Sequence, residues 1–130
     1  MSAEKALRDV EEVIRRFGDE KALSSFRIEF ARRLEVLRLV EEHCRPGNTV
    51  LDLGAQPFII SCALRRMGYE VVAFDVEPEP YLKIAESCGV RAVKRDLETD
   101  ELGMDGADCA VFSEVFEHLH YYRIPLVMAR

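Results

Sequence analysis

Two different spacings of apolar residues divide this chain into two parts. Up to about residue 45, apolar residues recur at every third or fourth position, which is typical of amphipathic helices that pack on a core. One such stripe runs from Ala3 to Phe17, and Gly18 is expected to end that helix as a left-handed cap. A second helix is expected to begin near Ser24 or Ser25, either of which is suited to cap it, and to end before the turn at residues 46–48.

From residue 49 onwards, short apolar runs rich in strand-forming residues alternate with helical patterns. We expect strands at residues 49–53, 70–75, 90–94 and 108–113, helices at residues 58–67 and 78–87, and a last helix starting near Tyr121. Strands that alternate with helices form a parallel sheet covered on both faces, and right-handed crossovers restrict it to doubly wound topologies. The prediction is an α/β fold with about four mostly parallel strands and two preceding N-terminal helices.

Length and composition fit a single globular domain. The 130 residues are 48% hydrophobic, which is enough apolar material for one domain made of a helical extension (residues 1–45) and an α/β core (residues 49–120). The longest apolar runs are strand-sized, and the N-terminus carries no apolar signal region. We therefore expect a cytoplasmic protein without a membrane span.

The charged residues and the cysteines narrow the classes of partner and site. The net charge of −6 argues against the chain gripping a nucleic-acid backbone on its own. Basic residues gather at Arg32–Arg33 and Arg65–Arg66 on predicted helices, where a solvent-exposed helix face is the simplest interpretation. The four cysteines lack the spacing of a metal site or a redox pair, so we expect reduced, structural thiols.

Acidic residues stand at or just after the ends of all four predicted strands. Asp52 and Gly54 lie at the end of the first strand, Asp75 ends the second, Asp96 follows the third, and Ser113 and Glu114 end the fourth. The carboxyl ends of parallel strands meet at one edge of a sheet, and ligands of doubly wound sheets bind there, near the point where the strand order reverses. The sequence therefore predicts a ligand site along this edge.

Several of these positions suit a nucleoside-like ligand. Gly54 permits a tight turn and a close approach of the backbone, and the helix after it directs its free N–H groups into the same crevice. Asp75 stands about twenty residues after this turn, where an acidic side chain accepts hydrogen bonds from ribose hydroxyls. Asp96 is suited to accept from an exocyclic amine of a purine, with Val76 and Leu97 on the two faces of the ring.

Four segments together resemble, in order, the motifs of class I S-adenosylmethionine-dependent methyltransferases, which have a Rossmann-like fold. They are Val50–Ala55, Val72–Val76, Arg95–Glu98 and Ala107–Leu119, and the resemblance covers about residues 49–120. It implies S-adenosylmethionine as the cofactor and the transfer of its methyl group to a nucleophilic acceptor. No catalytic base is identified.

The resemblance also implies a role for each matching residue. The methionine part of the cofactor would be surrounded by Asp52, Gly54, Ala55 and Gln56, with Pro57 in the same turn. The ribose would be held by Asp75, and the adenine would meet Asp96 and Leu97, beside Val76. The methyl donor and the acceptor would lie near Ser113 and Glu114.

The sequence departs from this family in two ways. Gln56 and Phe58 stand where the family usually has further glycines, and we expect the chain to supply only four of the family's roughly seven strands, without the C-terminal ones. The fourth strand would then leave an apolar edge that proteins normally cover. We expect either a truncated or natural fragment, or a second chain or a further copy of this one at that edge.

Two functions from different classes remain open at this point. The first is a methyltransferase, or its cofactor-binding subunit, acting on an unidentified small molecule or on RNA, for which the acidic charge gives no support. The second is a non-catalytic methyltransferase-like subunit that stabilises or recruits a partner. A dinucleotide oxidoreductase is disfavoured because the turn lacks the G-x-G-x-x-G spacing. Glu114, Glu117 and His118 resemble a metal cluster of some methyltransferase branches, but they equally suit a pocket wall, and no metal is assigned.

Overall fold

The computed structural model describes residues 1–96 and 107–112 of the chain. Its helices are α1 (Ala3–Phe17), α2 (Glu20–Ile28), α3 (Phe30–His43), α4 (Ile59–Arg66) and α5 (Leu82–Cys88), with a short 3-10 helix, η1 (Glu79–Tyr81), before α5. Its strands are β1 (Thr49–Leu53), β2 (Glu70–Asp75), β3 (Arg91–Lys94) and β4 (Cys109–Val111). This order of elements confirms the predicted α/β class. No helix within the described ranges is long and apolar enough to cross a membrane.

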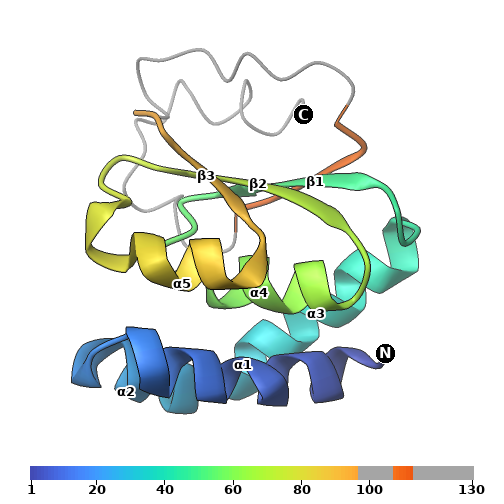
Figure 1. The fold of residues 1–130 in the computed structure, drawn as a ribbon. Coiled ribbons are helices and arrows are strands. Elements are labelled where there is room, and N and C mark those ends of the chain that lie inside the picture. The colour runs from blue at the N-terminus through green and yellow to red at the C-terminus, as the bar shows by residue number, and fades with distance from the viewer. Residues whose placement is uncertain (97–106, 113–130) are drawn as a thin grey trace.

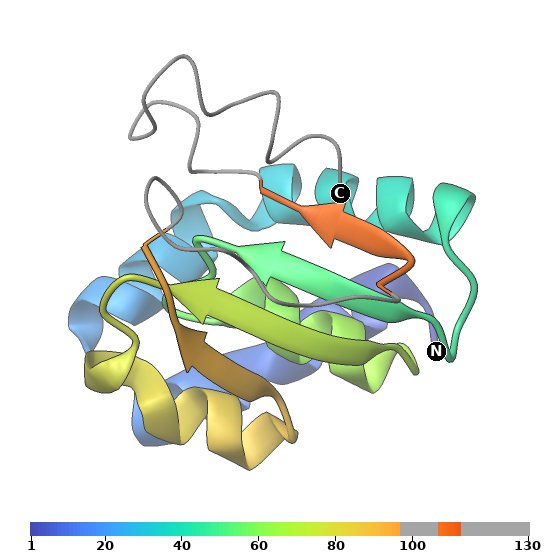
Figure 2. The same ribbon diagram turned by 90° about the horizontal axis from the view of Figure 1, so that it is seen from above.

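The four strands form one parallel sheet in the order β3-β2-β1-β4. Val50 of β1 stands opposite Val71 of β2 on one side and opposite Cys109 of β4 on the other. The strands run outward from β1 to β3, and the chain then returns to the far side of β1 to form β4 (Figure 2). The strand order therefore reverses between β1 and β4, which is where doubly wound sheets bind their ligands.

The described helices form two layers on one face of this sheet (Figure 1). α4 and α5 lie directly beneath the strands, and α1 lies beneath them in contact with both, next to α2. The structure confirms the predicted stripe of α1 except at its last residue, because Leu7, Val10 and Ile14 are fully or almost fully buried whereas Phe17 is 38% exposed. The expected covering of the second face is not seen among the described residues, and the helix expected near Tyr121 lies outside them.

The N-terminal region holds three helices before β1, instead of the two that the sequence predicts. α2 begins at Glu20 rather than at the expected serines, because the Asp19 side chain caps it by accepting a hydrogen bond from the Ala22 N–H at 2.8 Å. The helical path then breaks at Glu29, whose φ and ψ of −97° and 11° separate α2 from α3. The predicted second helix is thus two helices with a bend between them.

Gly18 ends α1 as predicted, but not in the left-handed conformation. Its backbone is extended, with φ of −96° and ψ of −174°, and its N–H donates to the Ile14 carbonyl at 2.8 Å. A Cβ at Gly18 would lie 2.8 Å from that same oxygen, which is closer than real Cβ contacts. Glycine is therefore needed here for space and not for a positive φ.

All four cysteines form disulfide bonds in this structure, so the expectation of reduced thiols is wrong. Cys44, just after α3, pairs with Cys109 in β4, and Cys62 in α4 pairs with Cys88 at the end of α5. The paired Cα atoms are 6.6 and 5.3 Å apart, within the range that a disulfide spans. The partners are 65 and 26 residues apart in the sequence, so the pairing follows from the tertiary fold and not from any local spacing.

Candidate functional site

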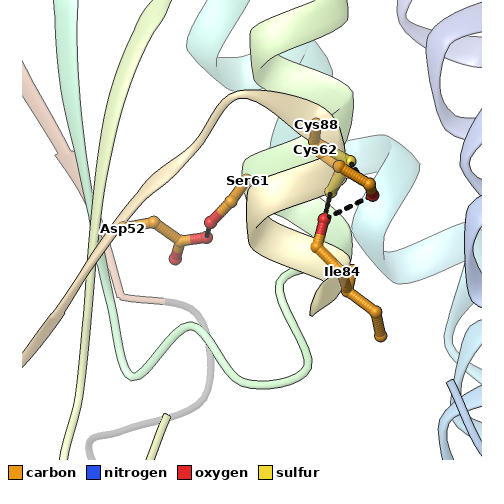
Figure 3. The surroundings of a disulfide bond; sticks show 6 residues. Asp52, Ser61, Cys62, Ile84 and Cys88 are labelled. Carbon is orange, nitrogen blue, oxygen red and sulfur yellow. Dashed lines mark hydrogen bonds between the residues drawn. A yellow bond between two sulfur atoms is a disulfide. The ribbon is translucent and has the colours of Figure 1, made fainter. Parts of the chain in front are cut away.

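The candidate site begins at the end of β1, where the strand order reverses. Side chains alternate along a strand, so Val50 and Asp52 face the helices while Leu51 belongs to the cluster on the opposite face. Asp52 is only 3% exposed, and its Oδ2 accepts a hydrogen bond from Ser61 Oγ of α4 at 2.5 Å (Figure 3). Buried carboxylates need hydrogen bonds or counter-charges, so this contact with α4 helps to fix the position of Asp52.

The turn that follows β1 is tied to the neighbouring strand β2. The N–H groups of Gly54 and Ala55 both donate to the Phe74 carbonyl, at 2.8 and 3.1 Å. Gly54 has a φ of +70°, a left-handed conformation that favours glycine. The turn is therefore held against the strand ends, as the resemblance to methyltransferases implies for a turn that approaches a cofactor.

Gln56 and Phe58, the two residues that replace glycines of the resembled family, are both accommodated in this turn. Phe58 has a φ of +73°, so it takes the backbone conformation that a glycine would take, while its ring is fully buried in the core. The left-handed conformation of a residue with a Cβ costs about 1–2 kcal/mol, which burial of the ring offsets. Gln56 and Pro57 are joined by a cis peptide bond, and Gln56 Nε2 donates to the Glu77 carbonyl at 3.0 Å.

Asp75 ends β2 beside this turn and binds it. Its Oδ2 accepts from the Gln56 N–H at 2.9 Å, and its Oδ1 accepts from the Glu77 N–H at 3.1 Å. Each carboxylate oxygen can accept two hydrogen bonds, so these two backbone contacts leave capacity for the hydroxyls of a ligand. Val76, the next residue, is 60% exposed and offers an apolar surface beside the carboxylate.

A small open hollow lies between α3, the end of β1 and the start of α4. Its lining consists of Arg33, Asp52, Gly54, Ala55, Gln56, Pro57, Ile59 and Ile60. The structure thus brings together all five residues predicted to surround or adjoin the methionine part of the cofactor. Ile59 and Ile60 belong to the first turn of α4, so the positive end of this helix adjoins the hollow, as predicted.

Arg33 also lines this hollow. The sequence predicted that Arg32 and Arg33 both lie on a solvent-exposed helix face, and for Arg33 this prediction is wrong. Arg33 is 3% exposed, whereas the side chain of Arg32 is 36% exposed and forms an ion pair with Glu29. Arg33 Nη1 and Nη2 donate to the carbonyl and hydroxyl oxygens of Ser25, each at 2.8 Å. The spacing carried the signal, because Arg33 lies four residues before the buried Leu37 on the same face of α3.

A contact between α2 and η1 fixes the N-terminal helices relative to the ligand edge. The Tyr81 hydroxyl donates to the Asp19 carboxylate, whose two oxygens both lie 3.2 Å away. Burial raises the pKa of Tyr81, and the negative charge of Asp19 raises it further. The hydrogen bond from the Ala22 N–H holds the pKa of Asp19 below its ordinary value, with a smaller contribution from Tyr81.

Several predicted site residues lie at the margin of the described structure or beyond it. Asp96 is half-buried two residues after β3, at the same edge of the sheet as Asp75. Leu97, Ser113 and Glu114 lie outside the described residues, as do the other members of the suggested metal cluster. In the part of the chain that the structure describes, no group of three or more His, Cys, Asp or Glu side chains could hold a metal ion.

Three solved structures share this arrangement of strands and helices. A TehB-like S-adenosylmethionine-dependent methyltransferase from Corynebacterium glutamicum is 22% identical, with a TM-score of 0.60 over 80% of this chain and 62% of the other. TehB from Haemophilus influenzae is 21% identical, with a TM-score of 0.61 over 73% of this chain and 34% of the other. A putative S-adenosylmethionine-dependent methyltransferase from Methanococcus maripaludis is 17% identical, with a TM-score of 0.65 over 98% of this chain and 57% of the other.

These likenesses show that the chain has the Rossmann-like fold of class I methyltransferases, which confirms the fold that the four motifs imply. The chain spans 34% to 62% of the lengths of these three proteins. No protein-family model matches the sequence, and no curated protein matches it significantly.

Proposed function

We propose that the chain binds S-adenosylmethionine and acts as a methyltransferase or as the cofactor-binding part of one. The observation that carries this proposal is the assembly of Asp52 and the glycine turn around one hollow, with Asp75 at the next strand end. This assembly lies at the reversal of strand order, where doubly wound sheets bind ligands. The shared fold with solved S-adenosylmethionine-dependent methyltransferases supports the same function.

The residues at this edge fit the three parts of the cofactor. Asp52 and the turn from Gly54 would hold the methionine part, at a hollow that is polar on one side and close to the positive end of α4. Asp75 would accept hydrogen bonds from the ribose hydroxyls while it keeps its backbone contacts. The exposed Val76 would cover one face of the adenine, and Asp96 would accept from its amine.

S-adenosylmethionine, when bound, supplies a methyl group on a positively charged sulfur. The residues of this chain would contribute by position, since the glycine turn and Asp75 would fix the donor so that an acceptor can approach it in line. We propose a small molecule or RNA as the acceptor, and a second chain or a second copy as the partner that covers the β4 edge.

A second candidate function is a non-catalytic subunit with a methyltransferase fold. The occupation of two glycine positions by Gln56 and Phe58 favours it, because side chains replace the open space that glycines leave beside a cofactor. The engagement of Gln56 Nε2 with a backbone carbonyl and the burial of Phe58 in the core favour the first candidate instead.

The test is calorimetric titration of the chain with S-adenosylmethionine and with its demethylated product, S-adenosylhomocysteine. We expect micromolar binding that Asp75→Ala weakens by about 10- to 100-fold, since ribose hydrogen bonds to a charged group are lost together with the anchor of the turn. Glu77→Ala is the matched control, because it removes an exposed carboxylate two residues away and leaves the backbone contact of Glu77 in place. Absence of binding to the folded wild-type chain would contradict the proposal and favour the non-catalytic function.

A further inference from the structure

Three hydrogen bonds form a closed ring around the Asp75 carboxylate, and the side chain of Gln56 completes it. Asp75 Oδ2 accepts from the Gln56 N–H at 2.9 Å, and Asp75 Oδ1 accepts from the Glu77 N–H at 3.1 Å. Gln56 Nε2 donates to the Glu77 carbonyl at 3.0 Å, which joins the two donor segments to each other. The ring therefore links the turn after β1 with the chain that follows β2.

This ring holds the carboxylate of Asp75 in one orientation. Two backbone N–H groups from different segments bind its two oxygens, so a rotation of the carboxylate would break both contacts. A carboxylate oxygen can accept two hydrogen bonds, so each oxygen keeps capacity for a further donor. An acceptor that is already oriented loses little freedom when a ligand binds, and such preorganisation raises the affinity.

The backbone alone cannot close this ring. A glycine at position 56, as the resembled family usually has, would keep the N–H that binds Asp75 but would have no side chain to reach Glu77. Asp75 is 8% exposed, whereas the bond between Gln56 and Glu77 lies at the surface. A surface hydrogen bond adds little to the stability of a fold. The Gln56 side chain is thus placed to act on Asp75 more than on the stability of the chain.

We propose that Gln56 is a positioning residue that acts on the ribose of S-adenosylmethionine through Asp75. This inference rests on the proposed binding of that cofactor, with Asp75 as the acceptor for its ribose hydroxyls. The Gln56 side chain holds the turn after β1 and the segment after β2 at the spacing at which their N–H groups orient the carboxylate. Glutamine at a glycine position then supports the cofactor site instead of blocking it.

The test measures how strongly the affinity depends on the ribose hydroxyls. Calorimetric titration compares S-adenosylhomocysteine with its 2′,3′-dideoxy analogue, which lacks both hydroxyls. In the wild-type chain we expect the loss of the hydroxyls to weaken binding by about 10- to 100-fold. Gln56→Met keeps the length of the side chain without its donor. We expect it to weaken binding of S-adenosylhomocysteine by about 3- to 10-fold, and binding of the analogue by less than about 2-fold.

Two controls separate this role from a general effect on the fold. Lys94→Met breaks another exposed contact with the segment after β2, the ion pair with Glu79 at 3.4 Å, which does not belong to the ring. It should leave the ratio of the two affinities unchanged. The melting temperature of Gln56→Met should lie within about 3 °C of the wild-type value, because only a surface hydrogen bond is lost.

The outcomes distinguish this inference from the proposed function. If the folded wild-type chain does not bind S-adenosylhomocysteine, the proposed function itself fails. If Gln56→Met weakens both ligands equally, Gln56 contacts another part of the cofactor or only shapes the turn, and the inference is overturned while the proposed function stands. The inference is also overturned if the wild-type chain binds both ligands equally, because Asp75 then does not hold the ribose.

A second variant and a measurement on the wild-type chain cover the case in which Gln56→Met does not fold. Gln56→Gly gives the same comparison of ligands, because it keeps the backbone N–H and removes the donor. A crystal structure of the wild-type chain with S-adenosylhomocysteine needs no variant. We expect Gln56 Nε2 to stay on the Glu77 carbonyl while the ribose hydroxyls donate to Asp75. A Gln56 amide that contacts the cofactor instead would overturn the inference.

Discussion

Removal of the Cys62–Cys88 disulfide is expected to destabilise the fold by an amount that follows from the topology. This bond joins α4 to the end of α5 across 26 residues, and it is nested inside the 65-residue span of Cys44–Cys109. Figure 3 shows it beside the carbonyl of Ile84, which lies 3.6 Å from Cys62 Sγ. The perturbation is the double substitution of Cys62 and Cys88 by alanine.

The magnitude is set by the entropy that each bridge removes from the unfolded chain. In the chain-entropy model a closed loop of n residues lowers that entropy by about 2.1 + 3.0 ln n cal/mol/K. The 26-residue loop gives about 12 cal/mol/K, or about 3.5 kcal/mol at 25 °C. The Cys62–Cys88 disulfide already closes 26 of the 65 residues that Cys44–Cys109 spans, so about 39 residues remain in the outer loop. This loop gives about 3.9 kcal/mol for the outer disulfide. Each bridge thus contributes a large part of a total stability that is usually about 5–15 kcal/mol.

The assay is urea unfolding followed by circular dichroism, with and without a thiol reductant. In oxidising buffer we expect the free energy of unfolding of the alanine variant to be about 3.5 kcal/mol lower than that of the wild-type chain. The reductant should destabilise the variant further only by breaking the Cys44–Cys109 disulfide. The fully reduced wild-type chain is the control. Like the reduced variant, it has no disulfide, so the free energies of unfolding of the two chains should differ only by the packing of two sulfur atoms. A wild-type unfolding curve that is unchanged by reductant, or four thiols that react with a thiol reagent in the denatured chain before reduction, would refute the pairing.

Three further changes test single contacts of the fold. Ser61→Ala should destabilise the chain by about 1.5–3 kcal/mol in urea unfolding, because it removes a buried hydrogen bond to the Asp52 carboxylate. Tyr69→Phe should cost about 1–3 kcal/mol, since the Tyr69 hydroxyl donates to the Cys44 carbonyl at 2.8 Å in the core, and thermal unfolding would measure the loss. Asp19 has a lowered pKa, so the stability that its charge contributes is present above its ordinary pKa of 3.8 and is lost as the pH falls through the lower folded-state pKa. Asp19→Asn should therefore lower the melting temperature at about pH 6 and make little difference at about pH 2.5, and an equal effect at both would contradict this assignment.

The strands and the ligand edge could be predicted from the sequence because their signals are local. The apolar run at 49–53 and the Gly54 turn fix the end of β1, and Asp75 follows at the spacing of a ribose-binding carboxylate. Parallel pairing then brings these positions to one edge without further information. The element boundaries at 49–53 and 70–75 agree with the structure at every residue.

The features that the sequence did not predict depend on contacts between separate segments. The spacing of Arg33 from Leu37 places it on the buried face of α3, but its charge is tolerated there because Ser25 of α2 binds it, and that contact joins two helices. The disulfide partners of Cys44 and Cys62 are likewise chosen by the fold, since no short spacing links them. The separate helix α2 was missed for a different reason, because the Asp19 cap competes with two serines that suit the same role.

The strand order has a consequence for the chain as it leaves the ribosome. β1 finds its first neighbour, β2, soon after synthesis, but its other neighbour, β4, begins 56 residues after the end of β1, from Leu53 to Cys109. At about 5–20 residues per second, the unpaired edge of β1 waits about 3–11 s for that partner. During that interval a nascent chain exposes the backbone groups of its central strand to other chains. Translation speed between β1 and β4 therefore sets how long this protein is vulnerable to mispairing before its sheet closes around β1.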